Sequence, residues 1–311
     1  MKISSVSFHG VPGLPDAQFD LSRNGEPAEL VLVTGPAASG KTAFLEAIAE
    51  AKESIAAYGG RPGRRMTRLD RKTSKVTIEW WLDDEERVIA GGGARRPSEA
   101  LFGAVDAGPD TAWDEGLRVL LGRWSVDSPK VEYFHAMRRM PAPPFPSSER
   151  VSATARLTTT DAKFEGLHSA IVESALGIAA ETEPPTRARR FERAFEALCR
   201  TKRFRGVARR PEGSYAAFDQ AAGGPWVALH ELSASEHQAA LFAAAFTMLR
   251  IDRSTVLIDT PELAQPPEVA EELLRGLASL GRNQLIVATT SQEILARVDR
   301  TTTTVLQLRG A

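Results

Sequence analysis

Residues 29–42 read ELVLVTGPAASGKT, an apolar run followed by a glycine-bounded loop. Residues 35–42 fit the pattern G-x-x-x-x-G-K-[ST], in which the main-chain amides of a loop surround a phosphate group. The run Glu29–Thr34 predicts a strand buried on both faces, and the pattern from Lys41 to about Ala57 predicts a helix. This order predicts a phosphate-binding loop at a helix N-terminus, where the helix dipole favours anions.

Each residue type in this loop suits phosphate binding. The glycines let the backbone approach the phosphate oxygens closely, Lys41 supplies a positive charge to the β- and γ-phosphates, and the Thr42 hydroxyl can ligate Mg²⁺. The residues predicted to bind the nucleotide are Gly35, Pro36, Ala37, Ala38, Ser39, Gly40, Lys41 and Thr42. The loop alone does not separate kinases, GTPases and ATPases.

The C-terminal half carries the motifs that do separate these classes. Val256–Asp259 (VLID) is an apolar strand that ends in an acid, the Walker-B pattern whose aspartate holds Mg²⁺. Leu232–Gln238 (LSASEHQ) stands earlier, at the start of an apolar helix, and residues 261–267 (PELAQPP) and 284–295 (QLIVATTSQEIL) follow the strand. Alternating strands and helices here predict a parallel sheet.

This order resembles the ABC-type ATPase heads of the SMC, RecF and OLD group. There a segment like IDEPEL is followed by one like QVIVTTHSPEIL, and LSASEHQ resembles the signature in its LSSGE-x-Q form. The resemblance implies an α/β P-loop NTPase fold with a mixed sheet core, N-terminal antiparallel strands and a small helical subdomain. It further implies a nucleotide-binding core of residues 1–140 and 226–311, with an inserted, signature-side helical subdomain at 141–225.

The resemblance also implies how such a head acts. Two heads bind ATP between them, so a homodimer or a pair with a related ABC-type head is expected, serving a separate effector in DNA repair or phage defence. Thr42 and Asp259 would hold Mg²⁺, and Arg61 or Arg64 would reach a nucleotide phosphate. The signature residues that would meet the other head's nucleotide are Ser233, Ala234, Ser235 and Glu236.

The positions that serve hydrolysis depart from this family. Thr260 stands where the catalytic glutamate is expected, and Thr290 stands where the switch histidine is expected. His135 or Arg138 takes the place of the metal-binding Q-loop glutamine, and Ser235 replaces the second signature glycine. A threonine cannot act as a general base at neutral pH.

The sequence therefore favours a head that binds Mg-ATP and hydrolyses it slowly or not at all. Glu262, two residues after Thr260, is the candidate substitute for the base, so Glu262, Thr260 and Thr290 are the candidate catalytic positions. Two alternatives stay open: an active ATPase of a RecF-like or OLD-like complex completed by a partner chain, and a structural subunit with permanently bound ATP.

Nucleic acid is a further candidate partner. The stretch 187–210 holds ten basic residues interleaved with phenylalanines, which is typical of a phosphate-binding face and also of an arginine-rich solvated helix face. The net charge of −1 excludes a polycation built for nucleic acid throughout.

Composition adds several exclusions and one local expectation. The apolar runs of the chain are too short to span a bilayer, no leader is visible, and Cys199 is the single cysteine, so we expect a cytoplasmic protein without a membrane partner, disulfide or zinc cluster. Lys75–Leu82 and Arg87–Ala90 predict a β-hairpin joined by the acidic turn Asp83–Glu86, with one of its two tryptophans in the core.

Overall fold

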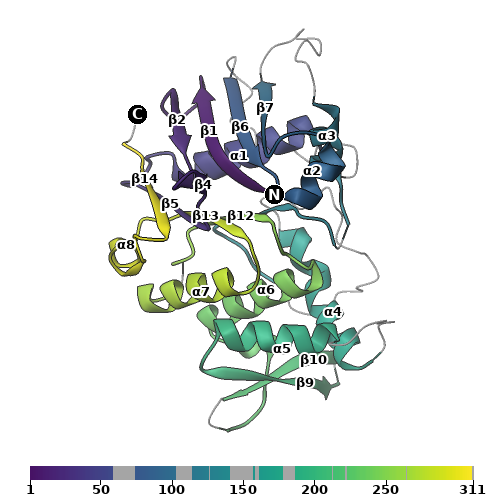
Figure 1. Cartoon of the computed structure of the whole chain (residues 1–311). Helices are drawn as coiled ribbons and strands as arrows, with labels where there is room; N and C mark the ends of the chain where they lie inside the picture. Colours follow the sequence, from purple (N-terminus) through teal and green to yellow (C-terminus); the bar gives the residue numbers. More distant parts are fainter. Residues whose placement is uncertain are drawn as a thin grey trace.

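The fold contains a parallel sheet and an antiparallel sheet, with helices between and below them (Figure 1). The computed structural model describes residues 1–58, 74–102, 114–125, 127–140, 157, 161–177, 186–211, 213–220, 223–263 and 265–309.

The parallel sheet has five strands in the order β14-β5-β13-β12-β8. Their bounds are β5 Leu30–Thr34, β8 Val131–Phe134, β12 Thr255–Asp259, β13 Gln284–Ala288 and β14 Thr303–Gln307. All four pairings are parallel, and the central strands β12 and β13 are buried along their whole length. The buried strand predicted before the glycine loop and the buried strand predicted at Val256–Asp259 are confirmed.

Helix α1 (Lys41–Ile55) belongs to the hydrophobic core on one face of this sheet. That core contains Phe44 and Ile48 of the helix, Val31 and Val33 of β5, and Trp80 of the antiparallel sheet. The other face is covered by α6 (Ala234–Met248) and α7 (Pro267–Ser279), whose apolar residues share a second core with residues of β5, β12 and β13. The alternation of side chains along the strands therefore divides the sheet's residues between two separate cores.

The antiparallel sheet packs on the far side of α1 in the order β2-β1-β6-β7. Its strands are β1 Lys2–His9, β2 Ala17–Asp20, β6 Ser74–Trp81 and β7 Arg95–Phe102, with a separate two-stranded pair, β3 Ser22–Arg23 and β4 Glu26–Pro27. The tryptophan expected in the core is Trp80, which is fully buried, while Trp81 is partly exposed.

The predicted hairpin between Lys75–Leu82 and Arg87–Ala90 is wrong. Residues Asp84–Ala90 form helix α2, and the antiparallel partner of β6 is β7. The acidic segment is a capping box: Glu86 N–H donates to Asp83 Oδ1 at 2.9 Å, and Asp83 N–H donates to Glu86 Oε2 at 2.9 Å. These reciprocal bonds satisfy the first amides of a helix, which a turn between strands would not require. Helix α3 (Glu115–Gly122) packs beside α2.

The lower part of the molecule combines helices with an antiparallel sheet (Figure 1). It contains η3 Asp161–Phe164, α4 Glu165–Ala175, α5 Arg187–Leu198, β9 Lys202–Arg210, β10 Gly213–Gln220, β11 Val227–Ala228 and η4 Leu229–Glu231. Phe191 and Phe195 of α5 contact Phe204 and Phe218 of the two long strands, with ring centroids 4.9–6.4 Å apart. Residues 141–225, expected as an inserted subdomain, thus include the β9–β10 hairpin as well as helices, and the aromatic residues join α5 to that hairpin.

Helix α8 (Gln292–Arg297) precedes the last strand. Within the described part of the chain, none of the helices has both the length and the apolar character needed to cross a bilayer.

His168 of α4 makes stability depend on pH. Its Nε2 accepts a hydrogen bond from the Ala216 N–H at 3.2 Å, and burial, with the charges of His230 and His237, lowers its pKa from 6.5 to about 4. A lowered pKa in the folded state means that stability is fully present above pH 6.5 and is lost as the pH falls toward 4.

We expect His168→Gln to flatten this dependence, because the Gln carbonyl can accept the same hydrogen bond without titrating. Urea unfolding at pH 7.5 and pH 4.5 measures the free energy of unfolding of each protein. Between these pH values the unmodified chain should lose more unfolding free energy than His168→Gln, by on the order of 1–3 kcal/mol. An identical pH dependence in both proteins would contradict this role.

Candidate functional site

The loop of residues 35–42 connects β5 to α1, and two of its glycines are required by the backbone. Gly40 has φ +90°, and a Cβ there would lie 2.2 Å from the carbonyl oxygen of Gly13. Gly35 has φ +150°, and a Cβ there would lie 2.5 Å from the carbonyl oxygen of Leu308. The loop is therefore fixed against the β1–β2 connection at one end and against the segment after β14 at the other.

The Lys41 side chain folds back over its own loop. Its Nζ donates to the carbonyl oxygens of Gly35 at 3.0 Å and Pro36 at 2.6 Å, and lies 3.4 Å from Ser39 Oγ. Burial lowers the pKa of Lys41, and the carboxylates of Asp259 and Glu262 oppose that shift. An ammonium group and the first amides of α1 together form a positive end that favours an anion.

Thr42 and Asp259 meet beside this loop. Thr42 Oγ1 donates to Asp259 Oδ2 at 2.9 Å, although 217 residues separate them in the chain. Burial raises the pKa of Asp259 above its usual value. Hydrogen bonds from Thr42 and Thr260 and the charge of Arg138 oppose this shift without cancelling it. A hydroxyl and a carboxylate are oxygen donors of the kind that Mg²⁺ prefers.

The donor set fits Mg²⁺ shared with a nucleotide better than a metal held by protein alone. Across the described ranges, no group of three or more His, Cys, Asp or Glu side chains is placed to hold a metal ion. Mg²⁺ is commonly bound through one or two protein oxygens plus phosphates and water, and Thr42 with Asp259 supplies that number.

The two threonines at the hydrolysis positions both donate to carboxylates. Thr260, whose φ is +48°, donates from Oγ1 to Asp259 Oδ1 at 3.0 Å. Thr290 donates to Glu262 Oε1 from its N–H at 2.9 Å and from its hydroxyl at 3.1 Å. The other oxygen of Glu262, Oε2, is buried and has no hydrogen-bond partner among the described residues. Of the three candidate catalytic positions, Thr290 and Glu262 are thus bonded to each other, whereas Thr260 is bonded to Asp259.

The signature segment forms the N-terminal turn of α6. Ser233 is its N-cap: the Ser233 N–H donates to Glu236 Oε2 at 2.9 Å, and the Glu236 N–H lies 3.4 Å from Ser233 Oγ. Ser233 and Ala234 are exposed, Ser235 is partly exposed, and the helix is buried from Ala239 onward. Glu236 also accepts a hydrogen bond from Thr201 Oγ1 at 2.9 Å. The capped turn therefore presents its small side chains to solvent.

Of the two candidates for the Q-loop position, Arg138 contacts the Walker-B strand. Its Nη1 donates to the carbonyl oxygen of Asp259 at 2.7 Å, and its Nε donates to Gln238 Oε1 at 2.7 Å. His135 packs near Phe164, with ring centroids 6.1 Å apart. Burial, with the charges of Lys163 and Arg138, lowers the pKa of His135 to about 3, so its imidazole is neutral at physiological pH.

The contact between Arg138 and Gln238 is not visible in the sequence. Gln238 belongs to the quoted signature segment, and Arg138 lies in the predicted position after a strand, but no spacing rule pairs residues that are 100 positions apart. Arg61 and Arg64, the candidate nucleotide-phosphate ligands, lie outside the described residues.

The basic stretch 187–210 is distributed over α5 and β9. Among the ion pairs that join described residues are those of Arg200 with Glu272, Arg205 with Asp219 and Arg210 with Glu231. Arg190 and Arg193 line a pocket of about 420 Å³ with Arg250, and apolar residues such as Phe246 and Ile251 also belong to its lining.

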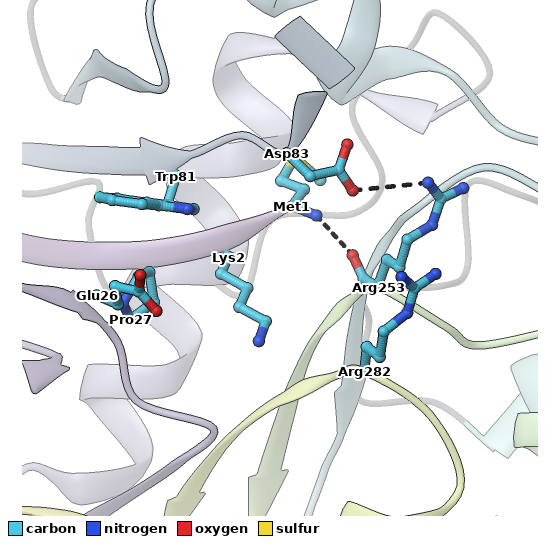
Figure 2. A pocket seen from close by; sticks show the side chains of 8 residues that line it. All are labelled: Met1, Lys2, Glu26, Pro27, Trp81, Asp83, Arg253 and Arg282. Atoms are coloured by element: carbon cyan, nitrogen blue, oxygen red, sulfur yellow. Dashed lines mark hydrogen bonds and ion pairs between the residues drawn. The ribbon is translucent and has the colours of Figure 1, made fainter. Parts of the chain in front are cut away.

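A smaller pocket of about 200 Å³ lies at the opposite edge of the parallel sheet (Figure 2). Arg253 and Arg282, which line it, precede β12 and β13, whereas the phosphate loop follows β5. Positively charged, negatively charged and apolar residues line this pocket: Met1, Lys2, Glu26, Pro27, Trp81, Asp83, Arg253 and Arg282.

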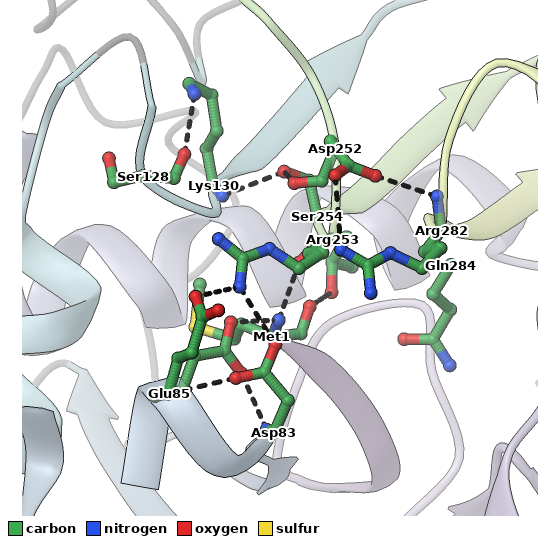
Figure 3. A network of polar contacts seen from close by, with 12 residues as sticks. Met1, Asp83, Glu85, Ser128, Lys130, Asp252, Arg253, Ser254, Arg282 and Gln284 are labelled. Carbon is green, nitrogen blue, oxygen red and sulfur yellow. Dashed lines mark hydrogen bonds and ion pairs between the residues drawn. The ribbon is translucent and has the colours of Figure 1, made fainter. Parts of the chain in front are cut away.

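A polar network beside this pocket connects the two sheets (Figure 3). Thr255 Oγ1 donates to the carbonyl oxygen of Met1 at 3.1 Å, and Arg253 forms ion pairs with Asp83 at 3.6 Å and with Glu85. Ser254 Oγ accepts the N–H of Lys130 at 3.0 Å, which ties β12 to the start of β8. These contacts hold α2 and β1 against the parallel sheet, away from the phosphate loop.

Comparison with solved structures identifies the fold. The chain is similar to an SMC head bound to the C-terminal winged-helix domain of ScpA, with a TM-score of 0.53 and 15% identity, covering 96% of this chain and 92% of that one. It is also similar to the SMC head domain with an extended coiled coil, bound to the C-terminal domain of ScpA and derived from Pyrococcus furiosus, with a TM-score of 0.54 and 14% identity, covering 99% and 94%. No protein-family model matches the chain. No curated protein matches it in sequence either.

The predicted fold class is confirmed: the mixed α/β architecture, with its antiparallel and parallel sheets, matches the P-loop NTPase fold of SMC heads. At this sequence identity the likeness concerns the fold.

Proposed function

We propose that this chain is an Mg-ATP-binding head of ABC type, in which ATP acts as a switch for association with a partner. The hydrogen bond between Thr42 and Asp259 carries the proposal, because it unites the end of the phosphate loop with the end of the Walker-B strand. The loop amides and Lys41 would bind the phosphates, and Thr42 and Asp259 would hold Mg²⁺. When bound, Mg²⁺ neutralises phosphate charge.

We propose that hydrolysis is slow or does not occur. A general base must accept a proton, and the hydroxyls of Thr260 and Thr290 are already donors to Asp259 and Glu262. Glu262 is the candidate substitute, although one of its oxygens is engaged by Thr290. The two alternatives remain: a partner chain that completes an active ATPase, and a subunit that keeps ATP permanently.

We propose that a second head, either an identical copy or a related one, covers the nucleotide with its signature turn. Support comes from the exposure of Ser233 and Ala234 at the positive end of a 15-residue helix that is buried from Ala239 onward. Ser235 and Glu236 belong to the same turn, where Glu236 is held by the cap. The turn has small side chains and free access, as an interface with a phosphate on another molecule would require.

The domain organisation and the effector are further parts of the proposal. Residues 1–140 and 226–311 would form the nucleotide-binding core, and 141–225 the inserted subdomain. Both similar SMC heads carry the C-terminal domain of ScpA, and by analogy a separate protein would bind this head. Service in DNA repair or phage defence stays a prediction from the resemblance.

Nucleic acid is the second candidate partner, and the pocket lined by Arg190, Arg193 and Arg250 favours it. Within the described residues, the guanidinium groups of Arg190 and Arg193 have no hydrogen-bond or ion-pair partner, and the Nε of Arg190 is buried. Their planar donor groups suit phosphate oxygens.

The dimer proposal predicts a change of mass in solution. Light scattering with Mg-ATP should show the 33.7 kDa chain double in mass, and removal of the nucleotide should reverse this. Lys41→Ala should lose both nucleotide binding and the dimer. Ala234→Arg should keep nucleotide binding and the Ser233 cap but stay monomeric, because a long cation would occupy the interface.

The matched control is Ala296→Arg, at an exposed position of α8, which should dimerise as the parent does. A dimer that forms without nucleotide, or that tolerates Ala234→Arg, would contradict the proposal.

The hydrolysis proposal predicts a gain of function. Thr260→Glu should raise the ATP turnover rate on the order of 100-fold, since a positioned base contributes about that much. The backbone there has φ +48°, which an unbranched residue adopts more easily than threonine. Thr260→Gln, of similar size but unable to act as a base, should show no gain.

A third variant, Glu262→Gln, tests whether Glu262 acts as the general base. It should leave nucleotide affinity unchanged within about twofold, and loss of all residual turnover would identify Glu262 as the base. Fast turnover in the unmodified chain would refute slow hydrolysis.

The nucleic-acid proposal predicts that Arg190→Glu with Arg193→Glu weakens DNA binding at least about tenfold in fluorescence anisotropy, with a smaller dependence on salt. Arg203→Glu with Arg209→Glu, two exposed positions on β9, removes the same charge and should have the smaller effect. No binding by the unmodified chain at low salt would exclude this partner.

A further inference from the structure

The cavity lined by Arg190, Arg193 and Arg250, here called the arginine pocket, has a volume of about 420 Å³. Ligand pockets in proteins span roughly 300–1,000 Å³, so this volume suits a small chemical group. Arg190 and Arg193 belong to α5, which packs against α6 and α7 (Figure 1), and Arg250 lies in the connection from α6 to β12. The pocket therefore lies where the parallel strands begin, whereas the phosphate loop follows the end of β5.

Arg190 and Arg193 line the pocket without a partner of their own. They are three positions apart on α5, so they lie on the same side of the helix. Within the described residues neither guanidinium has a hydrogen-bond or ion-pair partner, and the Nε of Arg190 is buried as well. A buried donor without an acceptor is unfavourable, and an acceptor brought by a ligand would satisfy it.

The charge pattern of α5 is the reverse of the one that stabilises a helix. Arg187, Arg189, Arg190 and Arg193 all stand in its first two turns, and its first turn contains no acidic residue. The N-terminal end of a helix is positive, so cations there are unfavourable and an anion is stabilised. A bound anion would offset both the helix dipole and the repulsion among these arginines.

Arg250 occupies a backbone position that favours glycine. It follows α6 in a Schellman motif: the Ile251 N–H donates to the Phe246 carbonyl oxygen at 2.9 Å, and the Arg250 N–H donates to the Thr247 carbonyl oxygen at 3.3 Å. The φ of Arg250 is +46°, in the left-handed region where glycine is the usual residue. Its ion pair with Asp127 joins two exposed side chains, and such pairs add little stability. The backbone therefore gives no reason for an arginine here.

One carboxylate also lines the pocket, and it is already paired. Asp252 Oδ1 accepts a hydrogen bond from the Arg282 N–H at 2.9 Å, and Asp252 Oδ2 lies 3.7 Å from the Arg282 guanidinium. The charge of Arg282 thus compensates that of Asp252. Arg190, Arg193 and Arg250 are left to balance the charge of a ligand.

Three guanidinium groups match a terminal phosphate better than a carboxylate or an internal phosphodiester. A phosphomonoester carries a charge of about −1.5 to −2 and three strong acceptor oxygens, whereas a carboxylate carries one charge and two oxygens. Guanidinium groups bind phosphate oxygens in pairs. An internal phosphodiester continues on both sides, which suits an open track of cations, whereas a chain end can enter a pocket. Ile251 and Leu280, which also line the pocket, offer apolar contact to the sugar.

We propose that the arginine pocket binds the phosphomonoester at the end of a nucleic-acid strand. The proposal rests on nucleic acid as the second candidate partner, and it names the part of that partner which is recognised. Arg187 and Arg189, at the start of the same helix, add positive charge beside the pocket. This favours a polyanion over a phosphorylated peptide as the bearer of the phosphate.

Oligonucleotides that differ only at one end test the proposal. One pair of single strands of about 12 nucleotides carries a fluorescent label at the 3′ end and either a phosphate or a hydroxyl at the 5′ end. A second pair has the label and the variable group exchanged. In fluorescence anisotropy with Mg-ATP present, the phosphorylated member of at least one pair should bind at least about tenfold more tightly than its hydroxyl partner.

Arg190→Gln with Arg193→Gln should reduce this preference to less than about twofold, because the two unpaired guanidinium groups are removed. The matched control is Arg203→Gln with Arg209→Gln, which removes the same charge at exposed positions of β9 and should keep the preference. Circular dichroism verifies that each variant is folded.

Arg250→Gly separates a role in binding from a role in the fold. It should reduce the preference for the phosphorylated strand, yet it should unfold at the same or a higher urea concentration than the unmodified chain, because glycine adopts the left-handed backbone without strain. A preference that persists in Arg250→Gly and in the double variant of α5 would overturn the inference.

Further results would overturn it in distinguishable ways. Equal binding of phosphorylated and hydroxyl strands would leave nucleic acid as a partner and exclude the terminal phosphate. A preference lost in Lys41→Ala and kept in the pocket variants would assign the phosphate to the phosphate loop. A phosphoserine peptide that binds at least as tightly as the phosphorylated strand would assign the pocket to a phosphorylated protein. No binding of any strand would remove the nucleic-acid candidate together with the inference.

Discussion

The site depends on the hydrogen bond between Thr42 Oγ1 and Asp259 Oδ2. This bond joins the loop that follows β5 to the end of β12, two parts of the chain that meet at one edge of the parallel sheet. The strand register produces it. Val33 of β5 is paired with Ala288 of β13, and Ala288 is paired with Asp259 of β12, so the loop after β5 and the acid at the end of β12 lie two strands apart. Parallel strands end at the same edge, which is where such sheets bind ligands.

Burial gives this edge its chemistry. Lys41 and Arg138 bring positive charge close to the carboxylates of Asp259 and Glu262, and these two carboxylates oppose the lowering of the pKa of both cations by burial. In a poorly hydrated site such charges must be paired or hydrogen-bonded. The hydroxyls of Thr260 and Thr290 donate hydrogen bonds to the carboxylates of Asp259 and Glu262, an arrangement that supports the proposal of slow hydrolysis.

The rest of the fold supports this edge from two sides. Helix α1 shares one core with both sheets, so the phosphate loop at its start is fixed by a large apolar contact surface. Helices α6 and α7 share the second core, which carries the signature turn on the opposite face of the same sheet. The loop and the turn thus stand on separate cores, and Arg138 is a direct polar link between the helix that bears the turn and the end of β12.

Local sequence determined the phosphate loop, the acid-terminated strand and the capped signature helix, because each depends on residues within a few positions of one another. A glycine-bounded loop and a Ser-x-x-Glu cap act through their own backbone. The segment Asp83–Glu86 carries the same kind of local signal, a capping box that begins helix α2, although its acidic residues are also compatible with a turn between strands. Only the tertiary structure decided that Thr290 engages Glu262 and that Arg138 joins Asp259 to Gln238, since such contacts depend on strand register and helix packing across the chain.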